Sequence, residues 1–371
     1  MRLIESKAEY IPQTDLYKHI ELCGRTAYKS EDKITESSAE GFVDRMIKSK
    51  HGAVLEHGTV YLEIDSIAEK DLDRIVARHK LWTLDDVQDS LRTNPTYNKY
   101  GEENWWAKNA SHIAKCMFNK YATNQYSNVN VVLKEHELNT DDRVLITPTS
   151  GYPDVRAVSG KIFSKFNAVF ITTNLRVLIE NEWLDDLKYL CEPTEYHEKR
   201  YTIKFITDRG VSHELVRHRK FSFVQESTRY CNYSKDKFGG EISYIMPSWF
   251  PKTNMQQQEA FMQIMKATED YYMALLGQWD ERKPDARFKT GFKNNPLTPQ
   301  QARQVLPNAL KTEVLMTGFA SDWRFFFDLR YYGKTGKPHP DMELLAGKAR
   351  EEFIKAGIWE DIMSKPSKFD K

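Results

Sequence analysis

The densest cluster of chemically capable side chains lies between Ser212 and Tyr230, where the chain reads SHELVRHRKFSFVQESTRY. This segment holds four arginine and lysine side chains and two histidines, of which His218 lies among the cations, together with serines, a threonine and a glutamine. Arginine presents a planar fork of N–H donors that matches two oxygens of a phosphate or carboxylate at once. The segment therefore favours a polyanionic small ligand, although a run of cations is also typical of a solvated surface.

A strand and a short helix are predicted to position these cations. Residues 201–207 alternate apolar and polar side chains, as a half-buried strand does, and residues 208–210 are typical of a turn. Ser212 then suits the N-cap of a helix that has Glu214 in its first turn. Because successive helical residues lie about 100° apart, Arg217 and Arg219 cannot face the same way on a regular helix. Either the helix ends before them, or the two arginines serve ligand groups on two sides.

Three segments, in this order, resemble the flavin-dependent thymidylate synthases. Residues 51–57 (HGAVLEH) resemble the family's His-x-Ser/Thr-x-x-Glu-His. The family signature is Arg-His-Arg, seven residues and then serine, and Arg217 to Ser227 has this spacing, with Arg-Tyr following. Residues 302–312 (ARQVLPNALKT) resemble the family's Ala-Arg-x-x-Leu-Pro-x-x-x-x-Thr. Together the resembling pieces cover most of residues 25–64 and 201–358.

The resemblance implies a methyltransferase that converts dUMP to dTMP, with methylenetetrahydrofolate as the carbon donor and FAD reduced by NADPH. It implies an α+β fold, in which a mixed sheet is flanked by helices. It also implies a homotetramer whose active sites are shared between subunits. Because the regions that resemble the family flank residues 66–200, we expect residues 1–371 to form one domain with an insertion there.

The resemblance also assigns roles by position. Arg330 becomes the catalytic residue, because a buried arginine can stabilise the negative charge that makes uracil a better carbon nucleophile. The expected flavin-binding residues are His51, Ala53, Glu56, Arg217, His218, Arg219 and Gln225. The expected substrate-binding residues are Glu214, Gln225, Ser227, Arg229, Arg303 and Arg330.

Departures from the family pattern affect several of these assignments. Glu214 stands where many members have glutamine, and a carboxylate repels a phosphate unless it is protonated or paired with arginine. Ala53 stands where a serine or threonine is usual, so it can offer only its backbone. Residues 319–321 (FAS) replace an Asn-x-Arg that contacts the flavin. Asn174 and Arg176 are hypothesised to supply replacement contacts to FAD, the alternative being that Asn174 is a plain helix cap.

No protein nucleophile is expected. The conventional thymidylate synthase uses a cysteine in a Pro-Cys context, and none of the four cysteines of this chain follows a proline. Ser227 lacks the Gly-x-Ser-x-Gly turn of hydrolases, so a hydrogen-bonding role suits it better. His213 and His218 are five residues apart rather than four, which argues against a zinc site of the HExxH type, and no metal is expected.

The composition argues against nucleic acid and membranes as partners. Lys+Arg of 54 against Asp+Glu of 53 gives a net charge of +1, whereas nucleic-acid binders usually carry a strong basic excess. No apolar run approaches the length of about 18 residues that a membrane span needs. The scattered cysteines indicate reduced thiols, so a cytoplasmic protein that contacts neither nucleic acid nor membrane is expected.

Two other classes remain open. One is another flavin or nucleotide enzyme on the same scaffold. The other is a non-catalytic nucleotide- or RNA-binding protein, for which Tyr97, Tyr100, Trp105 and Trp106 would be stacking platforms. Apolar patterning further predicts strands over residues 59–64 and 168–172, and helices over residues 36–48, 67–80, 175–189, 256–279 and 341–356.

Overall fold

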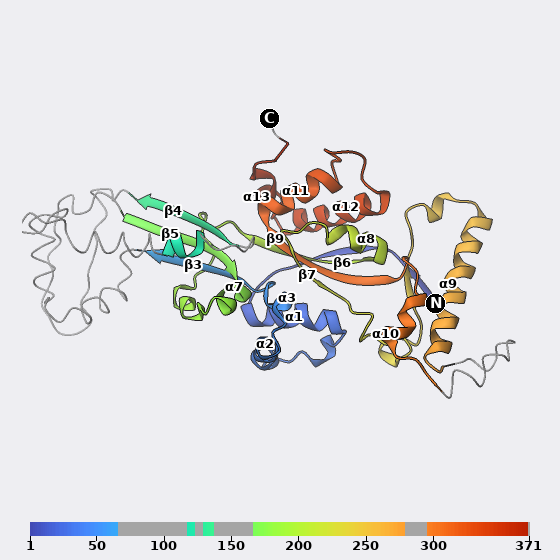
Figure 1. Cartoon of the computed structure of the whole chain (residues 1–371). Helices are drawn as coiled ribbons and strands as arrows, with labels where there is room; N and C mark the ends of the chain where they lie inside the picture. The colour runs from blue at the N-terminus through green and yellow to red at the C-terminus, as the bar shows by residue number, and fades with distance from the viewer. Residues whose placement is uncertain (66–116, 123–128, 137–165, 279–294, 370–371) are drawn as a thin grey trace, which may run out of the picture. The chain divides into compact units, whose positions relative to one another are not determined.

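The computed structural model describes residues 1–65, 117–122, 129–136, 166–278 and 295–369 (Figure 1). Within these ranges the chain combines helices with sheets, which confirms the α+β class. It divides into two compact units, described separately below. Unit 1 comprises Met1–Thr59, Asn174–Ile179 and Lys199–Lys371, and unit 2 comprises Val60–Thr173 and Glu180–Glu198. The interpretation of residues 66–200 as an insertion into one domain stays a prediction.

An antiparallel four-stranded sheet forms the centre of unit 1. Its order is β2 (Lys7–Ile11), β6 (Arg200–Asp208), β9 (Lys311–Phe319) and β7 (Ser222–Gln225). The strand expected over residues 201–207 is therefore confirmed as β6. A separate parallel pair joins β1 (Arg2–Ile4) to β8 (Ser243–Ile245), so both strand orientations occur in the unit.

Helices cover both faces of this sheet (Figure 1). On one face lie α8 (Arg209–Leu215), α11 (Ala320–Arg330), α12 (Pro340–Lys355) and α13 (Trp359–Ser364). On the other lie α1 (Leu16–Tyr28), α2 (Ser38–Lys48) and α3 (Gly52–Leu55). The helices predicted over residues 36–48 and 341–356 are thus confirmed as α2 and α12.

Aromatic side chains fill the core between the sheet and α11. Trp323 is fully buried, and its indole N–H donates to the carbonyl oxygen of Tyr201 over 3.0 Å, which ties α11 to β6. Its ring packs edge-on against Phe221, Phe326 and Phe353 at centroid distances of 4.8, 5.4 and 5.1 Å. Because α11 follows β9 directly, this packing fixes where the helix ends, at Arg330.

The start of α8 differs from the prediction. Its N-cap is Asp208, whose carboxylate accepts from the backbone N–H of Val211 over 2.8 Å, so the assignment of Ser212 as the cap is wrong. Aspartate caps as well as serine does, and Asp208 comes first where β6 ends. Ser212 lies inside the helix and donates to the carbonyl oxygen of Arg209 over 2.8 Å. Because α8 ends at Leu215, the helix stops before both arginines of the motif.

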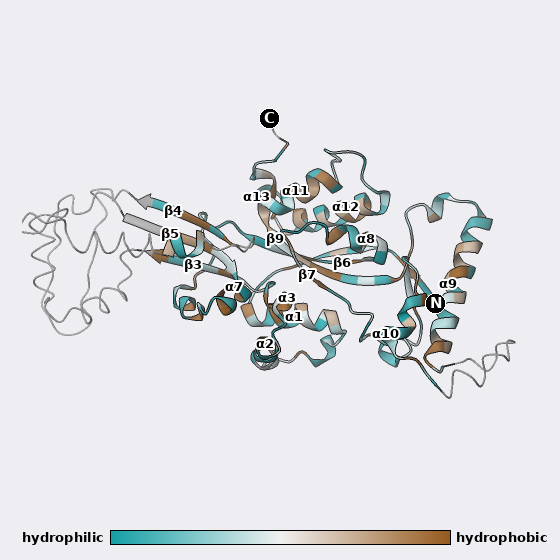
Figure 2. Ribbon diagram, viewed as in Figure 1, coloured by the Kyte–Doolittle hydropathy of each residue, from teal (hydrophilic) through white to brown (hydrophobic). Residues whose placement is uncertain are grey.

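Helices α9 and α10 lie on either side of residues 279–294 in the sequence. α9 (Met255–Leu275) confirms the helix predicted from residue 256, and its capping box joins Asn254 to Gln257. Figure 2 shows that it carries both hydrophobic and hydrophilic segments. α10 (Pro299–Ala302) leads into the 3-10 turn Arg303–Val305, and further 3-10 turns span Glu31–Lys33, Asp236–Phe238 and Phe250–Lys252.

The helix predicted over residues 175–189 is wrong as one element. It divides into α7 (Leu175–Glu180) and a 3-10 turn (Leu184–Tyr189). Between them Glu182 has a φ of 61°, a left-handed conformation that a regular helix does not accommodate.

Unit 2 contains a three-stranded sheet in the order β3 (Thr59–Asp65), β5 (Phe166–Asn174) and β4 (Asn130–His136). The strands expected over residues 59–64 and 168–172 are confirmed as β3 and β5. The predicted helix over residues 67–80 and the four candidate stacking residues between 97 and 106 lie outside the described residues. Among the helices that are described, none combines the length and the apolar character needed to cross a membrane.

Candidate active site

The Arg-His-Arg segment turns its histidine inward and its arginines outward. His218 is 8% exposed, and its ring lies 5.1 Å from that of Phe326 and 6.2 Å from that of Phe221. Arg217 and Arg219 on either side are exposed. Burial, with the nearby charge of Arg330 adding to it, lowers the pKa of His218 to about 4. The imidazole is therefore neutral near pH 7, and the two arginines provide the positive charge at the surface.

Arg330 makes the best-defined set of contacts in the site. Its Nε donates to Nε2 of His218 over 3.0 Å, and its Nη1 donates to Oε2 of Glu214 over 2.9 Å. Its Nη2 also donates to the backbone carbonyl oxygen of Glu214 over 3.4 Å. Residues expected in the site from two widely separated parts of the sequence thus meet, and Glu214 is paired with arginine rather than left to repel an anion.

The end of β7 places Gln225 and Ser227. The amide of Gln225 donates to the hydroxyl oxygens of Ser212 and Thr312 over 2.9 and 3.1 Å, which ties the motif to α8 and β9. The N–H of Ser227 donates to the carbonyl oxygen of Ala27 over 3.0 Å, and the N–H of Arg229 donates to the Ser227 hydroxyl over 3.3 Å. The loop that carries Ser227 is therefore fixed mainly through its backbone.

A buried ionic cluster next to Ser227 was not predicted. Glu226 is 1% exposed, and it accepts from the ammonium of Lys311 over 2.8 Å and from the hydroxyl of Tyr233 over 3.0 Å. Lys311 and Lys29 both also pair with Glu313, each over 2.5 Å. Burial raises the pKa of Glu313, but Lys311 and Lys29 outweigh it and hold that pKa below its ordinary value. Alternating charged residues in β9 gave a weak signal for this cluster, but Lys29 is distant in sequence.

A pocket of about 350 Å³ opens beside Arg303. Nη1 of Arg303 donates to the hydroxyl of Thr228 over 3.3 Å, and the backbone N–H of Arg209 donates to the carbonyl oxygen of Asn308 over 2.8 Å. The lining residues are Arg209, His213, Thr228, Arg303, Gln304, Leu306, Pro307, Asn308 and Leu310. Arg209, His213 and Thr228 were not predicted as site residues, although His213 and Thr228 adjoin predicted ones in the sequence. Arginine, imidazole and hydroxyl groups suit a phosphate.

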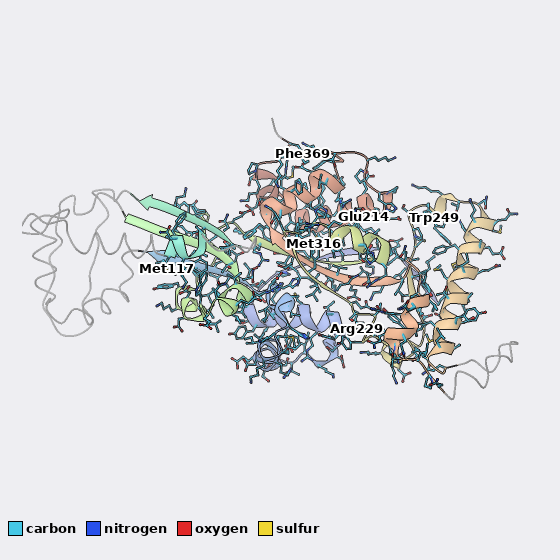
Figure 3. The ribbon with its side chains drawn as sticks, in the orientation of Figure 1. Met117, Glu214, Arg229, Trp249, Met316 and Phe369 are labelled. Carbon is cyan, nitrogen blue, oxygen red and sulfur yellow. The ribbon has the colours of Figure 1, made fainter. Side chains whose placement is uncertain are left out.

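The segment from His51 to Glu56 approaches the Arg-Tyr end of the motif. The hydroxyl of Tyr28 is 3.2 Å from Nδ1 of His51, and the Tyr28 ring lies 5.6 Å from that of Tyr230. The guanidinium of Arg229 lies 5.5 Å from the Tyr230 ring. Ala53 is exposed on α3. In the view of Figure 3, Arg229 and Glu214 lie on opposite sides of the sheet.

Asn174 and Arg176 both have structural partners. The side-chain oxygen of Asn174, which is fully buried, accepts from the N–H of Val177 over 3.2 Å, as a helix cap does. Arg176 pairs with the carboxylate of Glu56 and lies across Gly52, where an added Cβ would be 2.7 Å from its Nε. Arg176 therefore lies next to the His51–Glu56 segment. The burial of Asn174 and its hydrogen bond to Val177 favour the interpretation of Asn174 as a helix cap.

The described cysteines and metal-binding side chains form neither an activated nucleophile nor a metal site. Cys23, Cys191 and Cys231 are free thiols, and burial raises the pKa of all three, so none is an activated nucleophile. Cys116 lies outside the described residues. Across the described ranges, no group of three or more His, Cys, Asp or Glu side chains is arranged to hold a metal ion.

The comparison with known families gives a match that contains these residues. Residues 193–356 match the family described as thymidylate synthase complementing protein. The resemblance to the flavin-dependent thymidylate synthases is thereby confirmed over this region. The matched region contains the Arg-His-Arg motif, Arg303 and Arg330, whereas the His51–Glu56 segment lies outside it.

Curated relatives agree with this match. A flavin-dependent thymidylate synthase of Corynebacterium efficiens is 33% identical over 141 residues, which cover 37% of this chain and 50% of the relative. That of Geobacter sulfurreducens is 35% identical over 124 residues, 33% of this chain and 43% of the relative. The chain thus spans about half the length of the curated relatives that it matches. Among solved structures, the UMP/dUMP methylase PolB from Streptomyces cacaoi is 17% identical, with a TM-score of 0.33 over 44% of this chain and 70% of that chain.

Proposed function

We propose that the protein is a flavin-dependent thymidylate synthase, which reductively methylates dUMP to dTMP. Methylenetetrahydrofolate would be the carbon donor, and FAD reduced by NADPH would be the source of reducing equivalents. One observation carries the proposal. The residue at the position of the family's uracil-activating arginine, Arg330, is ordered by two residues of the Arg-His-Arg region, Glu214 and His218.

Arg330 can perform the chemistry that this reaction asks of the protein. Uracil becomes nucleophilic at its ring carbon when negative charge moves onto its N3 and carbonyl edge. A guanidinium that is 20% exposed and held in place stabilises that charge better than a mobile one in water. The three cysteines that the structure describes have raised pKa values, which supports activation by charge rather than by a protein nucleophile.

The residues present fit FAD. The cofactor carries a pyrophosphate, and the exposed guanidinium groups of Arg217 and Arg219 offer forks of donors beside the inward-facing His218. FAD would supply the redox chemistry of the reaction, while the chain binds it and orients it. Gln225, His51, Ala53 and Glu56 complete the proposed flavin contacts, to which Arg176 can be added through its pairing with Glu56.

The nucleotide would be held by its phosphate. Ser227 and Arg229 lie in the loop after β7, and Arg303 lines the adjoining pocket. Glu214 and Arg229 lie on opposite sides of the sheet in the view of Figure 3, whereas their neighbours His213 and Thr228 line the same pocket. We further propose a homotetramer with shared active sites, which the resemblance to the family implies, and a cytoplasmic location.

The test is the flavin reaction itself. We expect the purified protein to be yellow, and its reduced flavin to be reoxidised anaerobically by methylenetetrahydrofolate only when dUMP is present. Reoxidation that does not depend on dUMP would favour another flavin enzyme on this scaffold. Salt-sensitive RNA binding by a colourless protein would favour the non-catalytic alternative.

A further inference from the structure

Arg330 is held on three sides by its own chain. Its Nε, Nη1 and Nη2 donate respectively to His218 Nε2, to Glu214 Oε2 and to the backbone oxygen of Glu214. A guanidinium has five N–H bonds, and these contacts use three of them. One N–H on each terminal nitrogen therefore has no partner among the residues that the structure describes.

We propose that Glu214 and His218 are positioning residues for Arg330, which fix its guanidinium and leave one N–H on each terminal nitrogen for the substrate. The N3 and carbonyl edge of an ionising uracil can accept from a donor held in this way. This inference rests on the proposed function and deepens it, because it gives Glu214 a role other than substrate binding.

The carboxylate of Glu214 suits this role better than the binding of a phosphate. Its Oε2 is already occupied by Arg330 at 2.9 Å, and its side chain is 29% exposed. A second anion brought to this carboxylate would meet like-charge repulsion. Two contacts from one residue, through the side chain and through the backbone, instead define both the place and the plane of the guanidinium. Glutamine, the usual residue here, would keep the acceptor and lose the charge.

His218 closes the third side because it is neutral. Its Nε2 accepts from Arg330, so this nitrogen carries no proton and the neutral ring carries its proton on Nδ1. Burial against Phe221 and Phe326 disfavours the charged form, which agrees with the lowered pKa of His218. A protonated ring could not accept and would repel the guanidinium.

Holding Arg330 in advance affects the rate of reaction more than the binding of substrate. A free arginine side chain samples many rotamers, and ordering it during the reaction would add to the barrier. A positioning residue is therefore expected to change kcat, whereas a phosphate ligand would change KM for dUMP. These two roles of Glu214 can be separated kinetically.

The experiment compares E214A and E214Q with the wild type by steady-state kinetics. Loss of one hydrogen bond to a charged group predicts a decrease in kcat of roughly 10–150-fold for E214A, with KM for dUMP within about threefold of wild type. E214Q keeps an oxygen acceptor for Nη1 and is expected to recover most of that loss. E9Q is the matched control, because Glu9 pairs with Lys204 over 2.7 Å on the sheet, and it should behave as wild type.

Two further variants test whether the effect acts through Arg330. H218F keeps an aromatic ring against Phe326 but lacks the acceptor, so at saturating FAD its kcat should also decrease with KM for dUMP unchanged. In the R330A background, E214A should cause no additional loss, because the group that it positions is gone. A change confined to KM in E214A, or a full additional loss in the double variant, would overturn the inference.

A structural readout separates this inference from the proposed function. If the wild type forms no dTMP, the proposed function fails by itself. Crystal structures of wild type and E214A then decide the positioning role, whichever reaction is catalysed. We expect the Arg330 guanidinium to leave His218 in E214A; an unmoved guanidinium with unchanged contacts would refute the positioning role.

Discussion

Removal of the Glu226 carboxylate should both destabilise the protein and make the Ser227 loop less ordered. Glu226 is 1% exposed and accepts from Lys311 at 2.8 Å and from Tyr233 at 3.0 Å. Breaking a buried ion pair by removing one partner costs about 3–5 kcal/mol, because the other charge stays buried. Lys311 keeps a second partner in Glu313. We therefore expect Glu226→Ala to lower the free energy of unfolding by about 3 kcal/mol, at the low end of that range.

Urea unfolding of wild type, E226A and E226Q measures this effect. E226Q keeps an acceptor for Tyr233 and should lose less than E226A. The double variant E226M/K311M removes both charges and should recover part of the loss, since no unpaired charge stays buried. The same variants should raise KM for dUMP, because Glu226 directly precedes Ser227. An E226A protein with wild-type unfolding and KM would show that the cluster neither stabilises the fold nor orders the loop.

The remaining predictions concern the site and its buried histidines. Arg330→Ala should abolish most dTMP formation while FAD stays bound, as flavin absorbance of the purified variant would report; near-normal turnover would remove Arg330 from the mechanism. Arg303→Gln should raise KM for dUMP by roughly 10–150-fold, from the loss of a charged hydrogen bond, with little change in kcat; an unchanged KM would place the phosphate elsewhere. Arg176→Ala should lower the affinity for FAD, with a smaller effect on the thermal stability of the apoprotein. Unchanged affinity in an FAD titration would contradict the hypothesis that Arg176 contacts FAD. Burial, followed by the charge of Arg330 for His218 and of Arg200 for His19, lowers the pKa values of both histidines to about 4, so both rings are buried in the neutral form. Below pH 6.5 the histidines of the unfolded chain take up protons that the buried rings do not. The free energy of unfolding is therefore expected to decrease as the pH falls towards 4, by about 2 kcal/mol per histidine at pH 5. Equal midpoints of urea unfolding at pH 7.5 and pH 5 would contradict this.

The sequence predicted the elements better than the contacts between them. Strand β6 and helices α2, α9 and α12 follow from local apolar patterning, which does not depend on distant residues. The start of α8 was misplaced because Asp208 and Ser212 have the same capping chemistry, and only the end of β6 decides between them. The break at Glu182 was missed because the amphipathic pattern continues across it.

The candidate site residues came from motifs, and their roles stay predictions. Motif spacing named Arg330, Glu214 and His218, but their hydrogen bonds depend on α8 and α11 packing on the same face of the sheet. The cluster of Glu226, Lys311, Glu313 and Lys29 could not be predicted, because pairing between β9 and the residues that directly follow α1 and β7 depends on tertiary register.

Anaerobic turnover with labelled dUMP tests the central claim most directly. Wild-type protein with FAD, NADPH and methylenetetrahydrofolate should convert dUMP to dTMP, and omission of any one of these components should stop the conversion. Formation of dTMP that needs no flavin, or no dTMP from a protein that has bound both FAD and dUMP, would contradict the claim.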